Sequence, residues 1–100
     1  MPSMNIVINH SLGAAEAKAR LAGILPDLKA RFGGMIESLD ERWTGNTNAF
    51  AFRAKGMDVS GQLAVTDSTA TLVAELPMAA FLFKSTVESL LRAEATKLLS

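Results

Sequence analysis

Three runs of alternating apolar and polar residues in the middle of the chain constrain its fold more than any other feature. In the first run, Phe50, Phe52 and Ala54 fall on one side, and the intervening residues fall on the other. A period of two is typical of half-buried β-strands, because successive side chains point to opposite faces. The three predicted strands cover residues 49–55, 57–66 and 69–76.

Short turns separate these predicted strands. Lys55-Gly56 lies between the first two and Asp67-Ser68 between the second two, and both pairs are rich in turn-forming residues. Such pairs are typical of β-hairpins. The stretch therefore predicts an antiparallel meander with one apolar face and one solvated face.

Two further strands flank this meander in the sequence. Residues 4–9 form a β-branched run with Ile6 and Ile8 on one side, which predicts a strand at a sheet edge or paired with the end of the meander. Residues 35–43 alternate less clearly and carry more charge. Charge of this kind suits an edge strand.

A period of 3.6 residues predicts helices over residues 12–32 and 78–99. Ser11 is expected to cap the first helix, because its hydroxyl can accept an unpaired amide hydrogen of the first turn. Pro26 either kinks this helix or lies in the first turn of a second, abutting helix. Gly33-Gly34 is expected to end it.

The predicted order β-α-β-β-β-β-α indicates a single α+β domain over residues 1–100. We expect a five-stranded antiparallel sheet with two helices packed on one face, a two-layer sandwich that resembles a reduced helix-grip fold. The core side chains should fill this sandwich. A pocket is expected only if Ala54, Ala70 and Ala74 leave a hole opposite Pro26. The strand order stays open.

Composition argues against several classes of protein. Ten basic residues balance ten acidic ones without a basic cluster, so we expect no nucleic-acid partner. The chain has no cysteine, which fits a reducing cytoplasm and excludes thiolate chemistry. The first residues do not form a secretory signal. The longest apolar run, residues 76–83, is too short for a membrane span.

The sequence offers few candidates for catalysis or metal binding. His10 is the single histidine, and a structural contact beside a helix start explains it more simply than general-base chemistry. Glu37, Asp40 and Glu41 are best interpreted as a solvated edge, and Glu94 as a partner of Lys97 or Arg92. No phosphate-binding loop is present. We therefore expect a protein that is not an enzyme and uses no cofactor or metal.

Phe81, Leu82 and Phe83 cannot all face one core from a single helix. Either the helix begins late and these residues close one end of the sandwich, or they form an exposed apolar patch. Such a patch would contact a partner chain or an apolar surface.

Several short motifs, in order along almost the whole chain, carry a family resemblance. They are His10-Ser11-Leu12-Gly13, Phe32-Gly33-Gly34, Trp43-Thr44-Gly45-Asn46, Ala54-x-Gly56, Gly61-x-Leu63-x-Val65 and Leu76-Pro77. The sequence resembles the polyhydroxyalkanoic acid system proteins, a family of small bacterial proteins. It departs from the family pattern at Pro26, which interrupts a helix, and at Asn46, which replaces an acidic residue.

The resemblance implies a bacterial, cytoplasmic protein associated with polyhydroxyalkanoate granules, with no catalytic residues to carry over. His10, Ser11, Trp43, Gly45 and Gly61 are expected to have structural roles. The first hypothesis is a non-enzymatic protein that binds a granule, a granule protein or its own copy through residues 81–83. The alternative is a carrier of a small, lipid-like apolar ligand. An enzyme that uses His10 ranks last.

Overall fold

The structure is a computed structural model that describes residues 3–100, apart from the side chain of Phe32. The 3.6-residue period places Phe32 on the apolar stripe of the first predicted helix, and this prediction lies outside the described part. The elements in chain order are β1 (Ser3–Asn9), α1 (Ala14–Leu21), α2 (Ile24–Phe32), η1 (Gly33–Met35), β2 (Ile36–Thr44), β3 (Thr47–Ala54), β4 (Met57–Val65), β5 (Thr69–Glu75), η2 (Met78–Phe83) and α3 (Lys84–Leu98).

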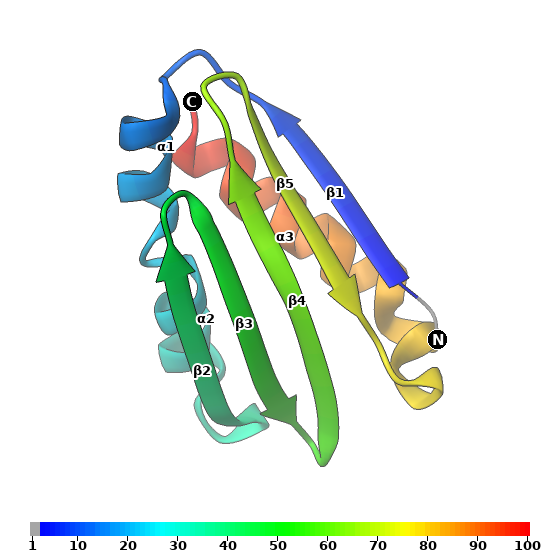
Figure 1. The fold of residues 1–100 in the computed structure, drawn as a ribbon. Helices are drawn as coiled ribbons and strands as arrows, with labels where there is room; N and C mark the ends of the chain where they lie inside the picture. Colours follow the sequence, from blue (N-terminus) through cyan, green and yellow to red (C-terminus); the bar gives the residue numbers. More distant parts are fainter. Residues whose placement is uncertain (1–2) are drawn as a thin grey trace.

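The five strands form one antiparallel sheet in the order β1-β5-β4-β3-β2 (Figure 1). Strands β3 to β5 form the predicted meander. Strand β2 pairs with β3, and β1 pairs with β5, so that Ile6 lies opposite Leu72. The two flanking strands, β1 and β2, are the sheet edges. The predicted fold class is confirmed, and the structure supplies the strand order that the sequence left open.

The first predicted helix is divided into α1 and α2. Gly23 separates them, and Pro26 lies in the first turn of α2, where its missing amide hydrogen breaks no helical bond. The second of the two alternatives for Pro26 is therefore correct. Gly33 follows α2 with a φ of 28°, as expected of a helix-terminating glycine.

The prediction that Ser11 caps the first helix is wrong. The helix begins at Ala14, and its N-cap residue is Gly13, which has no side chain that could bond to the first turn. Instead the amide of Ala14 donates to Oδ1 of Asp67 at 2.9 Å. Because Asp67 lies in the turn between β4 and β5, the cap comes from a residue distant in sequence, and a local pattern could not reveal it.

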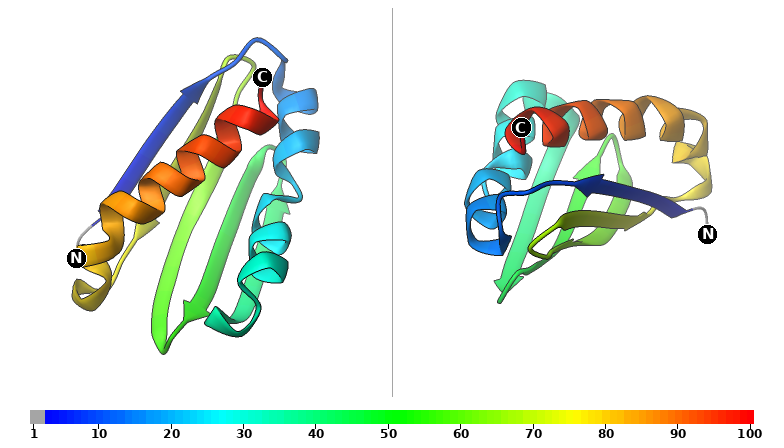
Figure 2. Two further views of the ribbon diagram at one scale, coloured as in Figure 1. Left: turned by 180° about the vertical axis from the view of Figure 1, so that it is seen from behind. Right: turned by 90° about the horizontal axis from the view of Figure 1, so that it is seen from above.

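The helix pair α1–α2 and the last helix, α3, cover the same face of the sheet (Figure 2). Helix α3 lies toward β1 and contacts α1, whereas α2 lies toward β2. The core between these layers is formed by buried side chains that alternate along the strands and recur along α1 and α2. They include Met4, Ile6, Ile8, Ala17, Leu21, Leu25, Leu28, Phe50, Val59, Leu63 and Leu76.

The last helical segment differs from the prediction in two ways. Residues 78–83 form the 3-10 helix η2, so α3 begins only at Lys84. In addition, none of the described residues of α3 is fully buried, although an apolar stripe runs along it. Val87 and Leu91 on this stripe are half-buried, and Leu90 is exposed. The stripe of α3 therefore faces a space that side chains do not fill.

Candidate functional site

An apolar cavity with a volume of about 360 Å³ lies between the sheet and the helices α2 and α3. Almost the whole of its lining surface is carbon. Leu25 and Leu28 contribute from α2, Phe50 and Phe52 from β3, and Val87 and Leu91 from α3.

The expectation that core side chains fill the sandwich is wrong. Helices α2 and α3 lie toward opposite edges of the sheet, so the central strands between them are left partly uncovered. Ala54 and Ala74 line the cavity on the sheet side, where their methyl groups fill little space. Ala70 lines a separate, smaller void of about 30 Å³. Two of the three alanines named from the sequence thus contribute to the cavity.

A bulge in β2 adds a lining residue that the alternation did not predict. The register shifts between Ile36 and Ser38, so Ile36 and Leu39 both face the cavity. A bulge inserts one extra residue into a strand, so the side chains beyond it point to the opposite face from the one that plain alternation predicts. For the same reason Glu37 and Glu41 lie on different faces, although plain alternation would place them on one face. Glu41 is half-buried on the side of Leu39, whereas Glu37 is exposed.

The cavity opens to solvent at a mouth formed by five residues that line it and are also exposed. They are Met35, Lys55, Phe83, Thr86 and Leu90. Lys55 is the one charged residue in the described lining, and Thr86 is the one other polar residue. Of these five residues, Phe83 alone was predicted as a site residue. The sequence signal for this space was the small size of Ala54 and Ala74, but the expectation of a filled core outweighed it.

The candidate patch at residues 81–83 is exposed. The exposed fractions are 53% for Phe81, 86% for Leu82 and 57% for Phe83, and Met78 in the same element is 76% exposed. Phe83 also belongs to the mouth of the cavity. We call Met78, Phe81, Leu82 and Phe83 the η2 patch, and it adjoins the mouth on the side of α3.

Glu94 pairs with Arg31, which is not one of its predicted partners. Its Oε1 lies 3.0 Å from Nη2 of Arg31. Nε of the same arginine lies 3.2 Å from a carboxylate oxygen of Asp27, on the helix of Arg31 itself. Arg31 belongs to α2 and Glu94 to α3, so this ion pair joins the two helices that flank the cavity. The expected pairing of Glu94 with Lys97 or Arg92 is replaced by this contact.

His10 connects the loop after β1 to the start of β5. Its Nδ1 accepts from the amide of Leu12 at 3.2 Å, and its Nε2 lies 3.3 Å from the carbonyl oxygen of Thr69. These bonds fit a neutral ring with the hydrogen on Nε2. The backbone amide of His10 donates to Ser68 as well. Ser11 beside it is exposed.

Trp43 and Gly45 meet a lysine from α1. Nζ of Lys18 donates to the carbonyl oxygen of Gly45 at 2.6 Å and lies 5.1 Å from the centre of the Trp43 ring. An ammonium over an indole ring is a favourable cation–π contact. Gly45 itself adopts a φ of 60°. These contacts attach α1 to the turn between β2 and β3, away from the cavity.

The acidic residues of β2 bond to different partners. Glu41 accepts from the side-chain amide of the buried Asn48 at 2.8 Å. Glu37 accepts from the amide of Gly56 at 3.0 Å and lies 3.6 Å from Nε of Arg53. Asp40 is exposed. These carboxylates therefore do not form one cluster.

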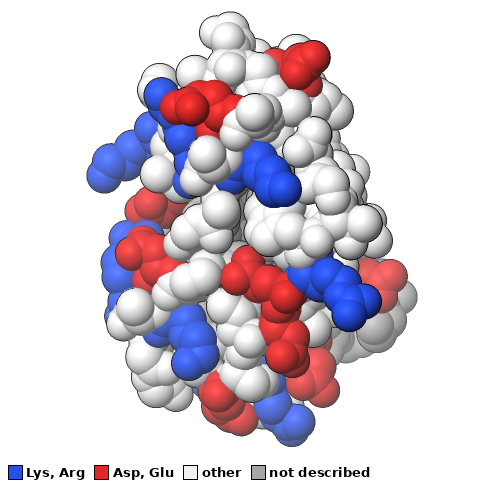
Figure 3. All heavy atoms as spheres, turned by 60° about the vertical axis from the view of Figure 1, so that its left-hand side comes forward, with Lys and Arg blue, Asp and Glu red and all other residues white. Residues whose placement is uncertain are grey.

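The surface carries both signs of charge. On the face shown in Figure 3, Lys and Arg side chains are mixed with Asp and Glu side chains. Within residues 3–100, no group of three His, Asp or Glu side chains is arranged to hold a metal ion. Of the helices in the same range, none combines the length and apolar character needed to cross a membrane.

Solved structures of low sequence identity share the fold of this protein. TTHA0849 from Thermus thermophilus aligns with a TM-score of 0.56 at 16% identity, over 98% of this chain and 94% of that chain. The Aha1 dimer from Colwellia psychrerythraea aligns with a TM-score of 0.59 at 14% identity, over 99% of this chain and 94% of that chain. DynU16, a protein from the dynemicin biosynthetic locus, aligns with a TM-score of 0.65 at 10% identity, over 97% of this chain and 45% of that chain. The fold is that of the helix-grip proteins.

The family follows from the sequence match. Residues 4–99 match the family described as "Putative polyhydroxyalkanoic acid system protein", and the chain belongs to this family. The resemblance expected from the motifs is thus confirmed over nearly the whole chain. The sequence matches none of the curated proteins with which it was compared.

Proposed function

We propose that this protein binds the alkyl chain of a small amphiphile in its apolar cavity and catalyses no reaction. The cavity carries this proposal. Ligand pockets in proteins are mostly apolar and measure roughly 300–1,000 Å³, and the cavity of about 360 Å³ falls within this range. A space of this size lined by carbon excludes the head of an amphiphile but accepts its chain.

Methionines in the lining support the same proposal. Met4, Met35 and Met57 all line the cavity. Unbranched thioether side chains adapt to irregular shapes, and they are frequent at surfaces that accept several ligands. We therefore expect the cavity to accept chains of more than one length.

The family name suggests where such chains come from. Polyhydroxyalkanoic acids are polyesters of hydroxyalkanoic acids, whose monomers carry alkyl chains. Membership in a polyhydroxyalkanoic acid system family thus favours monomers of this chemistry, or their derivatives, as ligands. A bacterial, cytoplasmic location, as expected from the sequence, is part of this proposal.

The substitution Ala54→Leu tests the proposed ligand site. The added side chain should occupy the cavity, weaken binding of decanoic acid at least about tenfold and leave the melting temperature equal or higher. Isothermal titration calorimetry measures the affinity, and thermal unfolding checks the fold. Ala51→Leu is the matched control, because Ala51 lies on the same strand but is exposed.

Two results would count against the cavity as the ligand site. One is wild-type protein that binds no decanoic acid at all. The other is a folded Ala54→Leu variant that binds decanoic acid as tightly as the wild type.

A second candidate function is contact with a polyhydroxyalkanoate granule or a granule protein through the η2 patch. The observation that favours it is the exposure of four bulky apolar side chains in one short element, of which Leu82 is the most exposed. Apolar patches on monomers often mark interaction sites. A second copy of this chain is another candidate occupant of the same patch.

Co-sedimentation with purified granules tests this second function. Wild-type protein should pellet with granules, and the double variant Phe81→Ser/Leu82→Ser should stay in the supernatant while remaining folded. Val73→Ser, which removes an exposed apolar side chain from a strand, should pellet like the wild type. Wild-type protein that never pellets would contradict granule binding, and analytical ultracentrifugation would then examine self-association through the patch.

A further inference from the structure

The mouth of the cavity combines apolar side chains with one cation. Met35, Phe83 and Leu90 supply apolar surface there, Thr86 supplies a hydroxyl, and Lys55 supplies the charge. The lining surface itself is almost entirely carbon. The aliphatic part of Lys55 therefore belongs to the wall, while its ammonium group reaches solvent at the edge of the mouth.

The backbone fixes where Lys55 lies. Lys55 and Gly56 have φ values of 51° and 76°, so both central residues of this two-residue hairpin turn are left-handed. The amide of Lys55 donates to the carbonyl oxygen of Met35 at 3.2 Å. This bond attaches the turn to η1 and keeps the base of the lysine side chain beside Met35 at the mouth.

The acidic residues near this turn are engaged by other groups. Arg53 lies 3.6 Å from Glu37 and 3.8 Å from Asp58, and Glu37 also accepts from the amide of Gly56. Lys55 forms no ion pair with any residue in the described range 3–100. Its charge thus lies at the mouth without a counterion among these described residues.

We propose that the amphiphile bound by the cavity is an alkanoic acid whose carboxylate pairs with the ammonium group of Lys55. This inference rests on the proposed ligand-binding function. A carboxylate inside the cavity would lose its hydration without gaining a partner, which is strongly unfavourable. At the mouth it keeps water and gains a charge-assisted hydrogen bond from Lys55. The chain then lies in the cavity with its acid end outward.

Decanoic acid and 1-decanol are the matched probes, because they share the chain and differ in the charged head. At pH 8 and low salt, wild-type protein should bind the acid more tightly than the alcohol in calorimetric titrations. Lys55→Gln should weaken binding of the acid about twofold to fivefold and leave binding of the alcohol unchanged. Lys55→Arg should keep the preference for the acid.

Two controls separate a specific ion pair from general charge. Lys97→Gln removes a lysine from the last turn of α3, away from the described lining, and should change neither affinity. Raising the salt concentration should reduce the preference of the wild type for the acid, because exposed charges are screened, and should have little effect on the alcohol.

The outcomes distinguish this inference from the function beneath it. If the Lys55→Gln variant keeps the wild-type ratio of acid to alcohol affinity, Lys55 does not bind the carboxylate, although the cavity still binds the chain. If the wild type binds neither probe, the proposed function itself fails and the inference fails with it.

Discussion

Among the described glycines, Gly61 is the one position where an added Cβ atom would meet other atoms within 4 Å. A Cβ atom at this position would lie 2.2 Å from the carbonyl oxygen of Val73, 2.8 Å from Cα of Ala74 and 2.9 Å from the ring of Phe50. Two of these three atoms belong to the backbone of β5 and cannot move without bending the strand. The absence of a side chain at Gly61 thus lets β4 and β5 stay paired under the buried ring of Phe50.

We expect Gly61→Ala to destabilise the protein by about 3 kcal/mol, because the methyl group forces the backbone or the Phe50 ring to shift. Urea unfolding followed by circular dichroism measures the change. Gly34→Ala is the matched control, since a Cβ there meets nothing within 4 Å, and it should stay within about 1 kcal/mol of the wild type. Equal stability of both variants would disprove the steric explanation.

At the level of single residues, alternation predicts well which face of the sheet a side chain lies on, but it does not predict the hydrogen bonds of polar side chains. It placed Phe50 inward, and the structure confirms this. Two positions earlier on the same face lies Asn48, which is also buried and donates to Glu41. The sequence does not reveal this bond, because it depends on the pairing of two strands. Likewise, the sequence identifies Lys55 only as a turn residue, and its place at a cavity mouth follows from the packing of α2 and α3.

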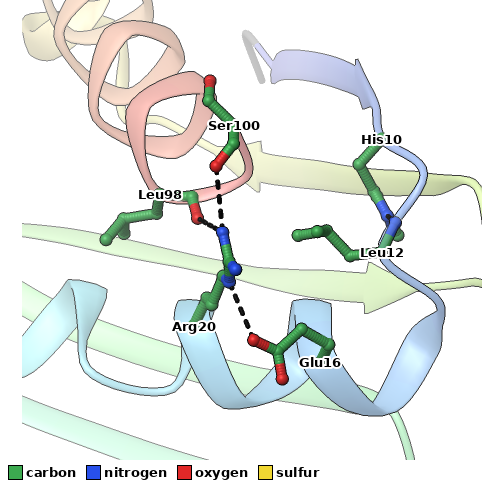
Figure 4. A network of polar contacts seen from close by, with 6 residues as sticks. All are labelled: His10, Leu12, Glu16, Arg20, Leu98 and Ser100. Atoms are coloured by element: carbon green, nitrogen blue, oxygen red, sulfur yellow. Dashed lines mark hydrogen bonds and ion pairs between the residues drawn. The ribbon is translucent and has the colours of Figure 1, made fainter.

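Helices α1 and α3 are joined by one arginine (Figure 4). Nη1 of Arg20 donates to the carbonyl oxygens of Leu98 at 3.2 Å and Ser100 at 3.0 Å, while its Nε donates to Glu16 at 3.0 Å. The carbonyl groups at the end of a helix lack helical partners and carry partial negative charge. Arg20 therefore both caps α3 and fixes it against α1.

Arg20→Ala should lower the free energy of unfolding by about 1–2 kcal/mol, since it removes bonds to otherwise unpaired carbonyl groups. Chemical denaturation measures the loss. Glu16→Ala is the control, because it removes the contact within α1 and keeps the bonds to α3, and it should cost no more than about 0.5 kcal/mol. If Glu16→Ala cost as much as Arg20→Ala, the contact within α1 would explain the whole effect.

At the level of elements, the sequence predicted which segments are strands and helices, and it erred where distant contacts decide. The cap of α1 comes from Asp67, and a register shift in β2 brings Ile36 to the inner face. The late start of α3 at Lys84 was one of the alternatives that the bulky residues 81–83 raised. The division of the first helix was one of the two alternatives that Pro26 raised, because proline acts locally.

At the level of the whole molecule, composition predicted a core but not its shape. The apolar fraction of 49% supplies enough side chains to cover the sheet. It does not indicate that α2 and α3 lie toward opposite edges and leave the centre of the sheet partly uncovered. A cavity is a property of how layers are spaced, and spacing depends on contacts such as the pair of Arg31 and Glu94 that no periodicity records.

The pairing of β1 with β5 has a consequence for how the chain acquires its fold during synthesis. The strands from β2 to β5 can form hairpin by hairpin as they leave the ribosome, because each pairs with its neighbour in sequence. Residues 3–9 are made well before residues 69–75, with which they pair in the folded protein. Ile6 and Ile8 therefore lack their partner strand until residues 69–75 have been made. Such segments are prone to aggregate, so this strand is where a chaperone would be needed.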